Sequence, residues 1–218
     1  MSDRAIILAN GSVHNADTLR TRLQPWKEAT VIAADGGVQH AARLGLEISI
    51  VIGDLDSLDE EEHMALEAIG TDVLRFAAQK DETDLELALL HAIQIGVREI
   101  VVLGAFGDRI DMSLSNLLLL THPSFLSVRI EYWYDHQTAW LIRPPGDEIH
   151  GQSGDTLSLI PLEGAAEGIT TYELYYPLKD EKLAFGPARG VSNVLTASVA
   201  RVELGSGMLI AVHSPGEM

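Results

Sequence analysis

The sequence predicts two different kinds of structure in its two halves. Residues 1–130 alternate continuous Val/Ile/Ala runs with amphipathic helical patterns, which is typical of a parallel sheet covered on both faces. Residues 131–218 hold short β-like runs separated by Gly and Pro turns, which favours an antiparallel sandwich. We therefore predict an α/β domain with a Rossmann-like sheet, followed by an all-β sandwich.

In the first half, each expected strand is a short apolar run. The clearest helix is 82–95, where Leu85, Ala88, Leu89 and Ala92 recur at the spacing of one buried helical face and Gly96 stops the helix. The full set of expected strands is 5–9, 30–34, 48–52, 72–76 and 99–103, and that of expected helices is about 16–24, 37–45, 59–69, 82–95 and 112–121.

The pattern changes after about residue 125. Residues 128–134 (VRIEYWY) alternate apolar with mixed side chains, and turn sequences such as PPGDE, GQSGD and LEGAAEG follow. The domain boundary is expected within 122–145, with the domains assigned as 1–130 and 131–218. Further strands are expected at 156–160, 168–174, 198–204 and 208–212.

Charge and composition exclude several classes of function. Fifteen Lys and Arg against 32 Asp and Glu give a net charge of −17, which disfavours binding to nucleic acid or to an anionic membrane. The chain has no cysteine, so disulfides and thiolate chemistry are excluded. The first apolar run is too short for a signal peptide and no stretch is long enough to span a bilayer, so a cytoplasmic protein is expected.

Carboxylates follow the strand expected at 48–52. Asp54 and Asp56 lie two residues apart where open α/β sheets bind ligands, and both can approach one hard cation such as Mg²⁺. The alternative is that both are turn residues, with Asp56 or Ser57 capping the next helix.

A second acidic cluster, KDETD, follows the strand expected at 72–76. Asp81 and Asp84 are three residues apart at the start of a helix, so both can face one ligand beside Lys80. Helix capping by Asp81 or Thr83 is the simpler explanation, but it accounts for only part of the cluster.

Glycine-containing loops follow the other three strands. Gly104 and Gly107 permit close approach to a ligand, Arg109 offers a planar fork to phosphate, and Asp111 adds a carboxylate; a glycine-rich turn with a surface ion pair is the alternative. The other two loops carry Asn10 after the first strand and Asp35, Gly36 and Gly37 after the second. Because the carboxyl ends of parallel strands share one edge, the five loops together predict a Mg²⁺–nucleotide site.

In the order and spacing of its motifs, the sequence resembles the thiamin pyrophosphokinase family over nearly its whole length. The motifs in the first half are ADGG at 34–37, GDLDS at 53–57, KDETD at 80–84 and GAFGDRIDM at 104–112. Those in the second half are YPL at 176–178, LAFGPARG at 183–190 and GVSN at 190–193.

The resemblance implies transfer of a pyrophosphoryl group from ATP to the hydroxyl of thiamin, in a homodimer whose active sites lie between subunits. Asp54, Asp56 and Asp84 match the acidic motifs for Mg²⁺, and Ser192 and Asn193 match the motif near thiamin. The residues expected to act in catalysis or to bind the nucleotide are Asp54, Asp56, Asp81, Asp84, Arg109, Asp111, Asn10, Asp35, Gly36, Gly37, Lys80, Gly104 and Gly107. The third motif departs from the family pattern, because Asp108 replaces a glycine and Met112 replaces His or Gln.

Other functions stay open at this point. One is a pyrophosphokinase for another small alcohol, such as a hydroxymethyl pyrimidine or a pterin, and another is a Mg²⁺-dependent phosphohydrolase, since GDLDS is similar to a DxDx nucleophile loop. A nucleotide or thiamin sensor without turnover is the third, and it rests on Asp108 and Met112.

Overall fold

The chain divides into two compact units, Met1–Asp135 and His136–Met218. The computed structural model describes residues 2–54, 71–77 and 79–216. The boundary predicted between residues 130 and 131 falls inside strand β6 (Arg129–Tyr134), which lies in the first unit.

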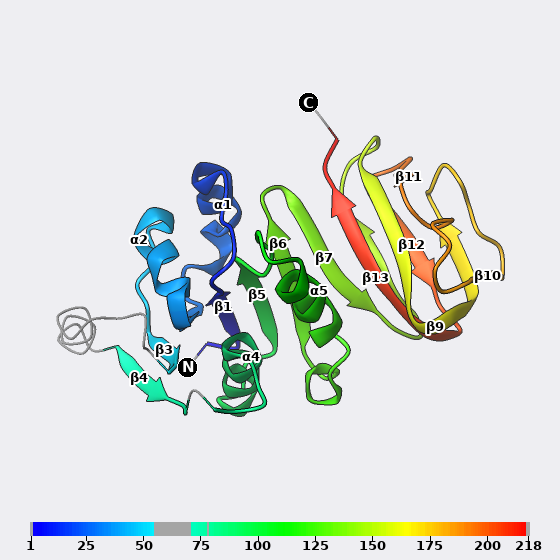
Figure 1. Ribbon diagram of the computed structural model, residues 1–218. Coiled ribbons are helices and arrows are strands. Elements are labelled where there is room, and N and C mark those ends of the chain that lie inside the picture. Colours follow the sequence, from blue (N-terminus) through cyan, green and yellow to red (C-terminus); the bar gives the residue numbers. More distant parts are fainter. Residues whose placement is uncertain (1, 55–70, 78, 217–218) are drawn as a thin grey trace. The chain divides into compact units, whose positions relative to one another are not determined.

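The first unit alternates strands with helices (Figure 1). Its remaining strands are β1 (Arg4–Leu8), β2 (Thr30–Ala34), β3 (Ile50–Gly53), β4 (Asp72–Arg75) and β5 (Glu99–Leu103). Its described α-helices are α1 (Ala16–Arg22), α2 (Ala41–Leu44), α4 (Asp84–Gln94) and α5 (Ile110–Leu119), and Gln24–Trp26, Asp35–His40 and Pro123–Phe125 are 3₁₀ helices.

The strands of the first unit form a parallel sheet in the order β4-β3-β2-β1-β5-β6. In β1, β2 and β5 four consecutive residues are buried, so both faces of the sheet are covered. Helices α1 and α2 bury Leu19 and Leu44 in a cluster with Ile6 of β1, and α4 packs against β1, β2 and β3. The prediction of a parallel α/β unit is confirmed.

The predicted helices differ from the observed ones at both their starts and their ends. The helix expected at 37–45 is wrong over its first half, because Asp35–His40 is 3₁₀ and only Ala41–Leu44 is α-helical. Asp35 has a left-handed φ of 44° and two glycines follow it, so a regular α-helix is not favoured there. Helix α5 begins two residues before the expected 112, and the helix expected at 59–69 lies outside the described residues.

Strand β6 corrects the prediction for residues 128–134. It was grouped with the antiparallel half, but it pairs in parallel with β5, with Ile100 opposite Ile130. Its exposed Arg129 and half-buried Glu131 alternate with buried Ile130 and Tyr132, which produced the alternating pattern in the sequence.

All strand pairings within the second unit are antiparallel among the described residues. The strands are β7 (Gln137–Ile142), β8 (Gly146–His150), β9 (Thr156–Tyr172), β10 (Glu181–Leu183), β11 (Asn193–Val194), β12 (Val199–Glu203) and β13 (Ser206–Ser214). The order β7-β13-β9-β12-β8 is extended by β10 and β11, which also pair with β9. The prediction did not include β7, β8, β10 or β11 as strands.

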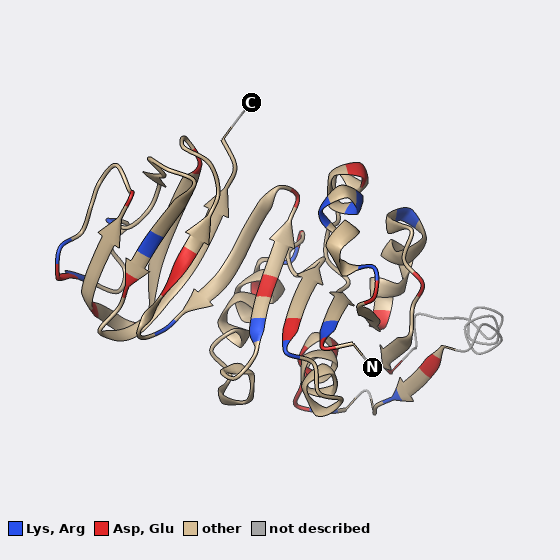
Figure 2. Cartoon of the chain, turned by 180° about the vertical axis from the view of Figure 1, so that it is seen from behind, with Lys and Arg blue, Asp and Glu red and all other residues tan. Residues whose placement is uncertain are grey.

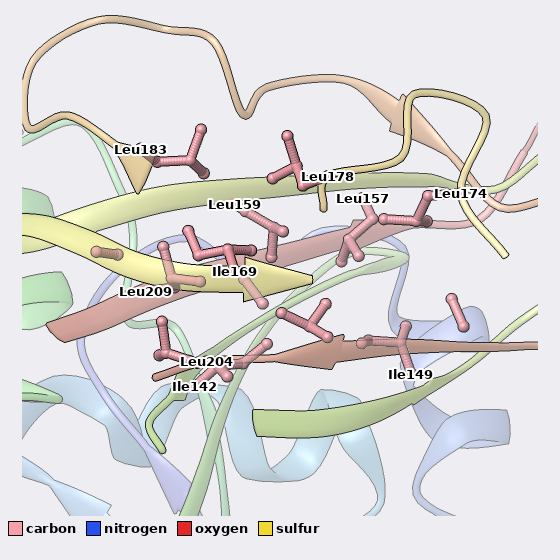
Figure 3. Close-up of a cluster of buried hydrophobic side chains, with 14 of the residues drawn as sticks. Ile142, Ile149, Leu157, Leu159, Ile169, Leu174, Leu178, Leu183, Leu204 and Leu209 are labelled. Carbon is pink, nitrogen blue, oxygen red and sulfur yellow. The ribbon is translucent and has the colours of Figure 1, made fainter. Parts of the chain in front are cut away.

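Strand β9 runs through the segment LEGAAEG, which was expected to be a turn between two strands. Glu163 and Gly164 have positive φ values of 57° and 116°, so the strand bends there without ending. Residues before the bend pair with β13 and β11, and residues after it pair with β10 and β12 and, at Glu167, again with β13. Buried side chains from these strands, including Leu157, Ile169 and Leu209, gather in one apolar cluster (Figure 3).

Charged side chains are scattered over both units. In Figure 2 the Lys and Arg positions of the described chain are interspersed with Asp and Glu positions along the backbone of both units. None of the helices that the structure describes is long and apolar enough to cross a membrane.

Candidate active site

A cavity of about 560 Å³ lies in the first unit, among the loops that follow the strands. The loops after β1, β2, β3, β4 and β5 contribute to it, together with the start of α4 and one side of α5. Its lining residues are Ala9, Asn10, Gly11, Ser12, Ala34, Asp35, Asp54, Lys80, Glu82, Thr83, Asp84, Leu85, Gly104, Ala105, Phe106, Gly107, Asp108, Arg109, Met112, Ser113 and Asn116.

Most residues expected in a nucleotide site of the first half lie on this cavity. They are Asn10, Asp35, Asp54, Lys80, Asp84, Gly104, Gly107 and Arg109. Asp81, Asp111, Gly36 and Gly37 do not line it, and Asp56 lies outside the described residues. The cavity therefore unites side chains from five separate loops.

Gly36 and Gly37 shape the site through close backbone packing. A Cβ atom on Gly36 would lie 2.5 Å from Oδ1 of Asn10, and one on Gly37 would lie 2.0 Å from the carbonyl oxygen of Leu8. The Gly37 contact is with backbone, so only glycine lets the segment after β2 approach β1 there, whereas a side chain at Gly36 would require the Asn10 amide to shift. These two glycines do not line the cavity themselves, but they pack against Asn10 and Ala9, which do.

Lys80 and Asp84 form an ion pair at the start of α4. The Lys80 Nζ lies 2.6 Å from Oδ1 of Asp84, and the two side chains are only 15% and 29% exposed. Thr83 caps the helix, since its hydroxyl accepts a hydrogen bond from the Glu86 amide at 3.2 Å. Capping by Thr83 leaves the Asp84 carboxylate on the cavity, whereas Asp81 lies outside it.

Arg109 precedes α5 and is held by Asp111. Its Nε and one terminal nitrogen donate to the two carboxylate oxygens of Asp111, at 3.1 and 2.5 Å. Hydrogen bonds from Arg109 hold the pKa of Asp111 below its ordinary value, so this carboxylate stays ionised and keeps its partner. Asp111 therefore orients Arg109 at the mouth of the cavity and does not itself line it.

Several lining residues were not included in the predicted site, and Ser12, Ser113 and Asn116 are among them. Ser12 follows Asn10 and Gly11, while Ser113 and Asn116 follow Arg109 by four and seven residues. Residues 109, 112, 113 and 116 share one side of a helix, so helical spacing from Arg109 was the signal that would have identified Ser113 and Asn116.

Ser192 and Asn193 lie in the second unit. The Asn193 side chain accepts from the Tyr176 amide at 3.0 Å and donates to the Tyr176 carbonyl at 2.8 Å. Tyr175 and Tyr176 are 66% and 64% exposed and pack edge to face. Asn193 thus fixes a turn that presents two aromatic rings to solvent.

The carboxylate side chains on the described part of the cavity are of the ligand type that a hard cation prefers. Asp54 and Asp84 both line it, and Mg²⁺ takes few protein carboxylates together with water and phosphate oxygens. Within residues 2–54, 71–77 and 79–216, no group of three or more His, Asp or Glu side chains is placed to hold a metal ion. A site formed by the described residues would therefore need oxygen ligands from water or substrate.

Comparisons with known proteins assign a family to both parts of the chain. The family model for the catalytic domain of thiamin pyrophosphokinase matches residues 23–132, and that for its vitamin B1 binding domain matches residues 146–209. A thiamine pyrophosphokinase of Bacillus subtilis is 29% identical over 185 residues, which cover 84% of this chain and 86% of the relative. A thiamine pyrophosphokinase 1 of Oryza sativa is 24% identical over 210 residues, with 84% and 79% covered.

Solved structures of similar proteins share the fold. The crystal structure of thiamine pyrophosphokinase from Bacillus subtilis matches with a TM-score of 0.84 and 24% identity, covering 98% of this chain and 100% of the other. Thiamin pyrophosphokinase from Candida albicans matches with a TM-score of 0.80 and 16% identity, covering 97% and 88%. With both family models matched in order along one chain, this protein belongs to the thiamin pyrophosphokinase family.

Proposed function

We propose that this chain transfers the pyrophosphoryl group of ATP to the hydroxyl of thiamin, giving thiamin diphosphate and AMP. The observation that carries the proposal is the cavity of the first unit, where Asp54 and Asp84 meet Arg109 and the loop Gly104–Gly107. Membership of the thiamin pyrophosphokinase family supports the choice of substrates. The first unit is then a Rossmann-like nucleotide domain and the second a β-sandwich.

We propose that Asp54 and Asp84, with Asp56 from outside the described residues, hold Mg²⁺. Carboxylate oxygens on a cavity of this size suit Mg²⁺ together with phosphate oxygens. When bound, the ion would neutralise charge that develops on the phosphates. The ion pair between Lys80 and Asp84 holds the oxygens of that carboxylate in place in the absence of substrate.

The chain's own residues bind and orient the reactants. Arg109 lies before the first turn of α5, where its guanidinium and the amides of the helix start favour phosphate. The thiamin hydroxyl oxygen attacks the β-phosphorus, the bond from that phosphorus to the oxygen of AMP breaks, and AMP leaves. The thiamin hydroxyl must also lose its proton to a base, and of the neighbouring carboxylates Asp81 and Asp84 only Asp84 lines the cavity.

Thiamin is assigned to the second unit. The vitamin B1 binding model matches residues 146–209, which include Ser192 and Asn193. Exposed Tyr175 and Tyr176 offer ring faces to a cationic heteroaromatic ligand, and the net charge of −17 attracts a cation. The same charge disfavours nucleic acid and an anionic membrane as partners. We propose a cytoplasmic location as well.

We also propose a homodimer. Helix α5 exposes Ile110, Leu114 and Leu118, which are 75%, 57% and 55% exposed and recur every four residues along one side. Such a stripe is unfavourable in water, and a second copy of the chain would cover it. Sedimentation of the purified protein is expected to give twice the mass of one chain.

The first test is AMP formation from ATP and Mg²⁺, with and without thiamin, with thiamin diphosphate measured in the same tube. Equal amounts of AMP and thiamin diphosphate are expected, both dependent on thiamin. ADP or AMP formed without thiamin would favour a phosphohydrolase, and turnover only with another alcohol would favour a different pyrophosphokinase. Binding of ATP without any turnover would favour a sensor.

Replacing Asp111 with Asn is expected to raise the KM for ATP by about three- to tenfold with a smaller change in kcat. The new amide group carries no charge and has an N–H₂ donor in place of one carboxylate oxygen, so Arg109 loses its charge-assisted pair of hydrogen bonds and must be ordered by the phosphate. Steady-state kinetics measure the change. The matched control is Asp17→Asn, which breaks an exposed Arg–Asp pair on α1 and is expected to leave the KM unchanged. A loss of kcat to background in Asp111→Asn would instead assign this carboxylate to the reacting atoms.

A further inference from the structure

Three backbone carbonyls of the loop between β5 and α5, those of Gly104, Ala105 and Phe106, are each held by a donor from another part of the first unit. The Gly104 oxygen accepts from the Gly11 amide at 2.8 Å, and the Phe106 oxygen accepts from the Ser12 amide at 2.6 Å. The Ala105 oxygen accepts from Nδ2 of Asn116 at 2.7 Å. A carbonyl oxygen turned toward bound phosphate would repel it, so these three bonds keep negative dipole ends away from an anion.

Asn116 is an unusual residue to find buried in α5. It is the buried residue of this helix, 5% exposed, while Leu114 and Leu118 on other sides of α5 are exposed. Its Nδ2 is used by Ala105, but its Oδ1 is buried and has no hydrogen-bond partner. A buried acceptor without a partner lowers stability, and leucine of similar size would avoid that loss. Packing alone therefore does not explain an asparagine here.

Asn116 also lies on the cavity, on the side of α5 that carries Arg109 and Ser113. Ser113 contributes a second link to the same loop, because its hydroxyl accepts from the Gly107 amide at 3.2 Å. The two side chains connect the helix that presents Arg109 to the loop that lines the cavity. The loop is consequently linked to the first two turns of α5, while Asp111 holds the exposed Arg109 guanidinium.

We propose that Asn116 is a positioning residue for the nucleotide: it holds the Ala105 carbonyl away from the phosphates and so keeps the loop Gly104–Gly107 in its anion-binding form. The inference rests on the proposed function, in which this loop receives ATP. Without the amide donor, the Ala105 carbonyl is released and turns toward solvent in the cavity. Part of the binding energy of ATP is then spent on restoring the loop.

The test is Asn116→Leu, with Ser115→Ala as the control on an exposed position of the same helix. The KM for ATP and the Kd for Mg–ATP, measured by titration calorimetry without thiamin, are expected to rise about tenfold, with kcat within about twofold. The melting temperature is expected to stay the same or rise, because the unpaired Oδ1 is removed. Unchanged affinity for ATP, or a loss of affinity that only follows a fall in stability, would overturn the proposal.

Asn116→Asp keeps the shape of the side chain and provides a second readout. A protonated carboxyl donates to the Ala105 oxygen and an ionised one does not, so the Kd for Mg–ATP relative to the parent protein is expected to rise with pH. A pH-independent ratio would contradict the proposal even if Asn116→Leu fails to fold. Both variants are compared with parent protein whose thiamin diphosphate formation is measured separately. Failure of that parent reaction would count against the proposed function, whereas unchanged Kd ratios would count against the role of Asn116.

Discussion

Replacing Asp54 or Asp84 with Asn is expected to abolish measurable formation of thiamin diphosphate, a loss of about 10³-fold or more in kcat. The two carboxylates reach the cavity from different elements, the end of β3 and the start of α4. Asn keeps the size of the side chain but removes the negative charge, so the variant loses the charge that would balance a Mg²⁺ ion near the phosphates. Asp84→Asn also removes the ionic partner of Lys80.

The rate of AMP formation with thiamin measures this effect, and circular dichroism with thermal unfolding shows whether the fold is retained. Asp72→Asn is the matched control, because Asp72 is an exposed carboxylate in β4 that does not line the cavity and its removal changes the net charge equally. The control is expected to keep normal activity. Near-normal turnover in either cavity variant would refute the assignment of that carboxylate to the metal.

The parallel strands were predictable because of where their side chains lie. In β1, β2 and β5 consecutive residues are buried on both faces, so the sequence shows uninterrupted apolar runs. Strand β6 lacks such an uninterrupted apolar run. Its Arg129 and Glu131 alternate with buried residues, which is the pattern typical of an antiparallel strand. Its place beside β5 depends on pairing between distant residues, which a local pattern does not encode.

Strand β9 shows the same limit in the second unit. Two glycines in LEGAAEG resemble a turn, yet the chain continues as a strand because both parts pair with neighbours that lie later in the sequence. Whether glycine ends a strand or only bends it is decided by those partners. Local composition therefore indicated an irregular backbone at Glu163 and Gly164, but it did not indicate that the strand continues past them.

Much of the candidate site followed from one topological rule, that the carboxyl ends of parallel strands meet at one edge. The rule led to Asn10, Asp35, Asp54 and Arg109, which all line the cavity. The rule did not show that Asp84 lines the cavity and Asp81 does not, because that depends on capping of α4 by Thr83. It also gave no reason to consider a buried amide such as Asn116 within an apolar helix.

Replacing Gly104 with Ala is expected to raise the KM for ATP by about 100-fold and to lower the melting temperature. Gly104 has a φ of 74°, and a Cβ atom there would lie 2.3 Å from the carbonyl oxygen of Ala9. The contact involves two backbone segments, so neither can move aside without displacing a loop of the cavity. The Gly11 amide, which donates to the Gly104 oxygen, would move with it.

Gly45→Ala separates this clash from backbone strain. Gly45 has a similar φ of 69° but nothing within 4 Å of its Cβ position, so alanine there meets only the strain of a left-handed conformation. It is expected to lower the free energy of unfolding by about 1 kcal/mol and to leave the KM for ATP unchanged. If both variants lost the same stability and bound ATP equally well, the Gly104 loop would have no special part in the site. A large KM effect confined to Gly104→Ala would place the nucleotide against the loop between β5 and α5, because the strain is common to both variants and only the clash with Ala9 differs.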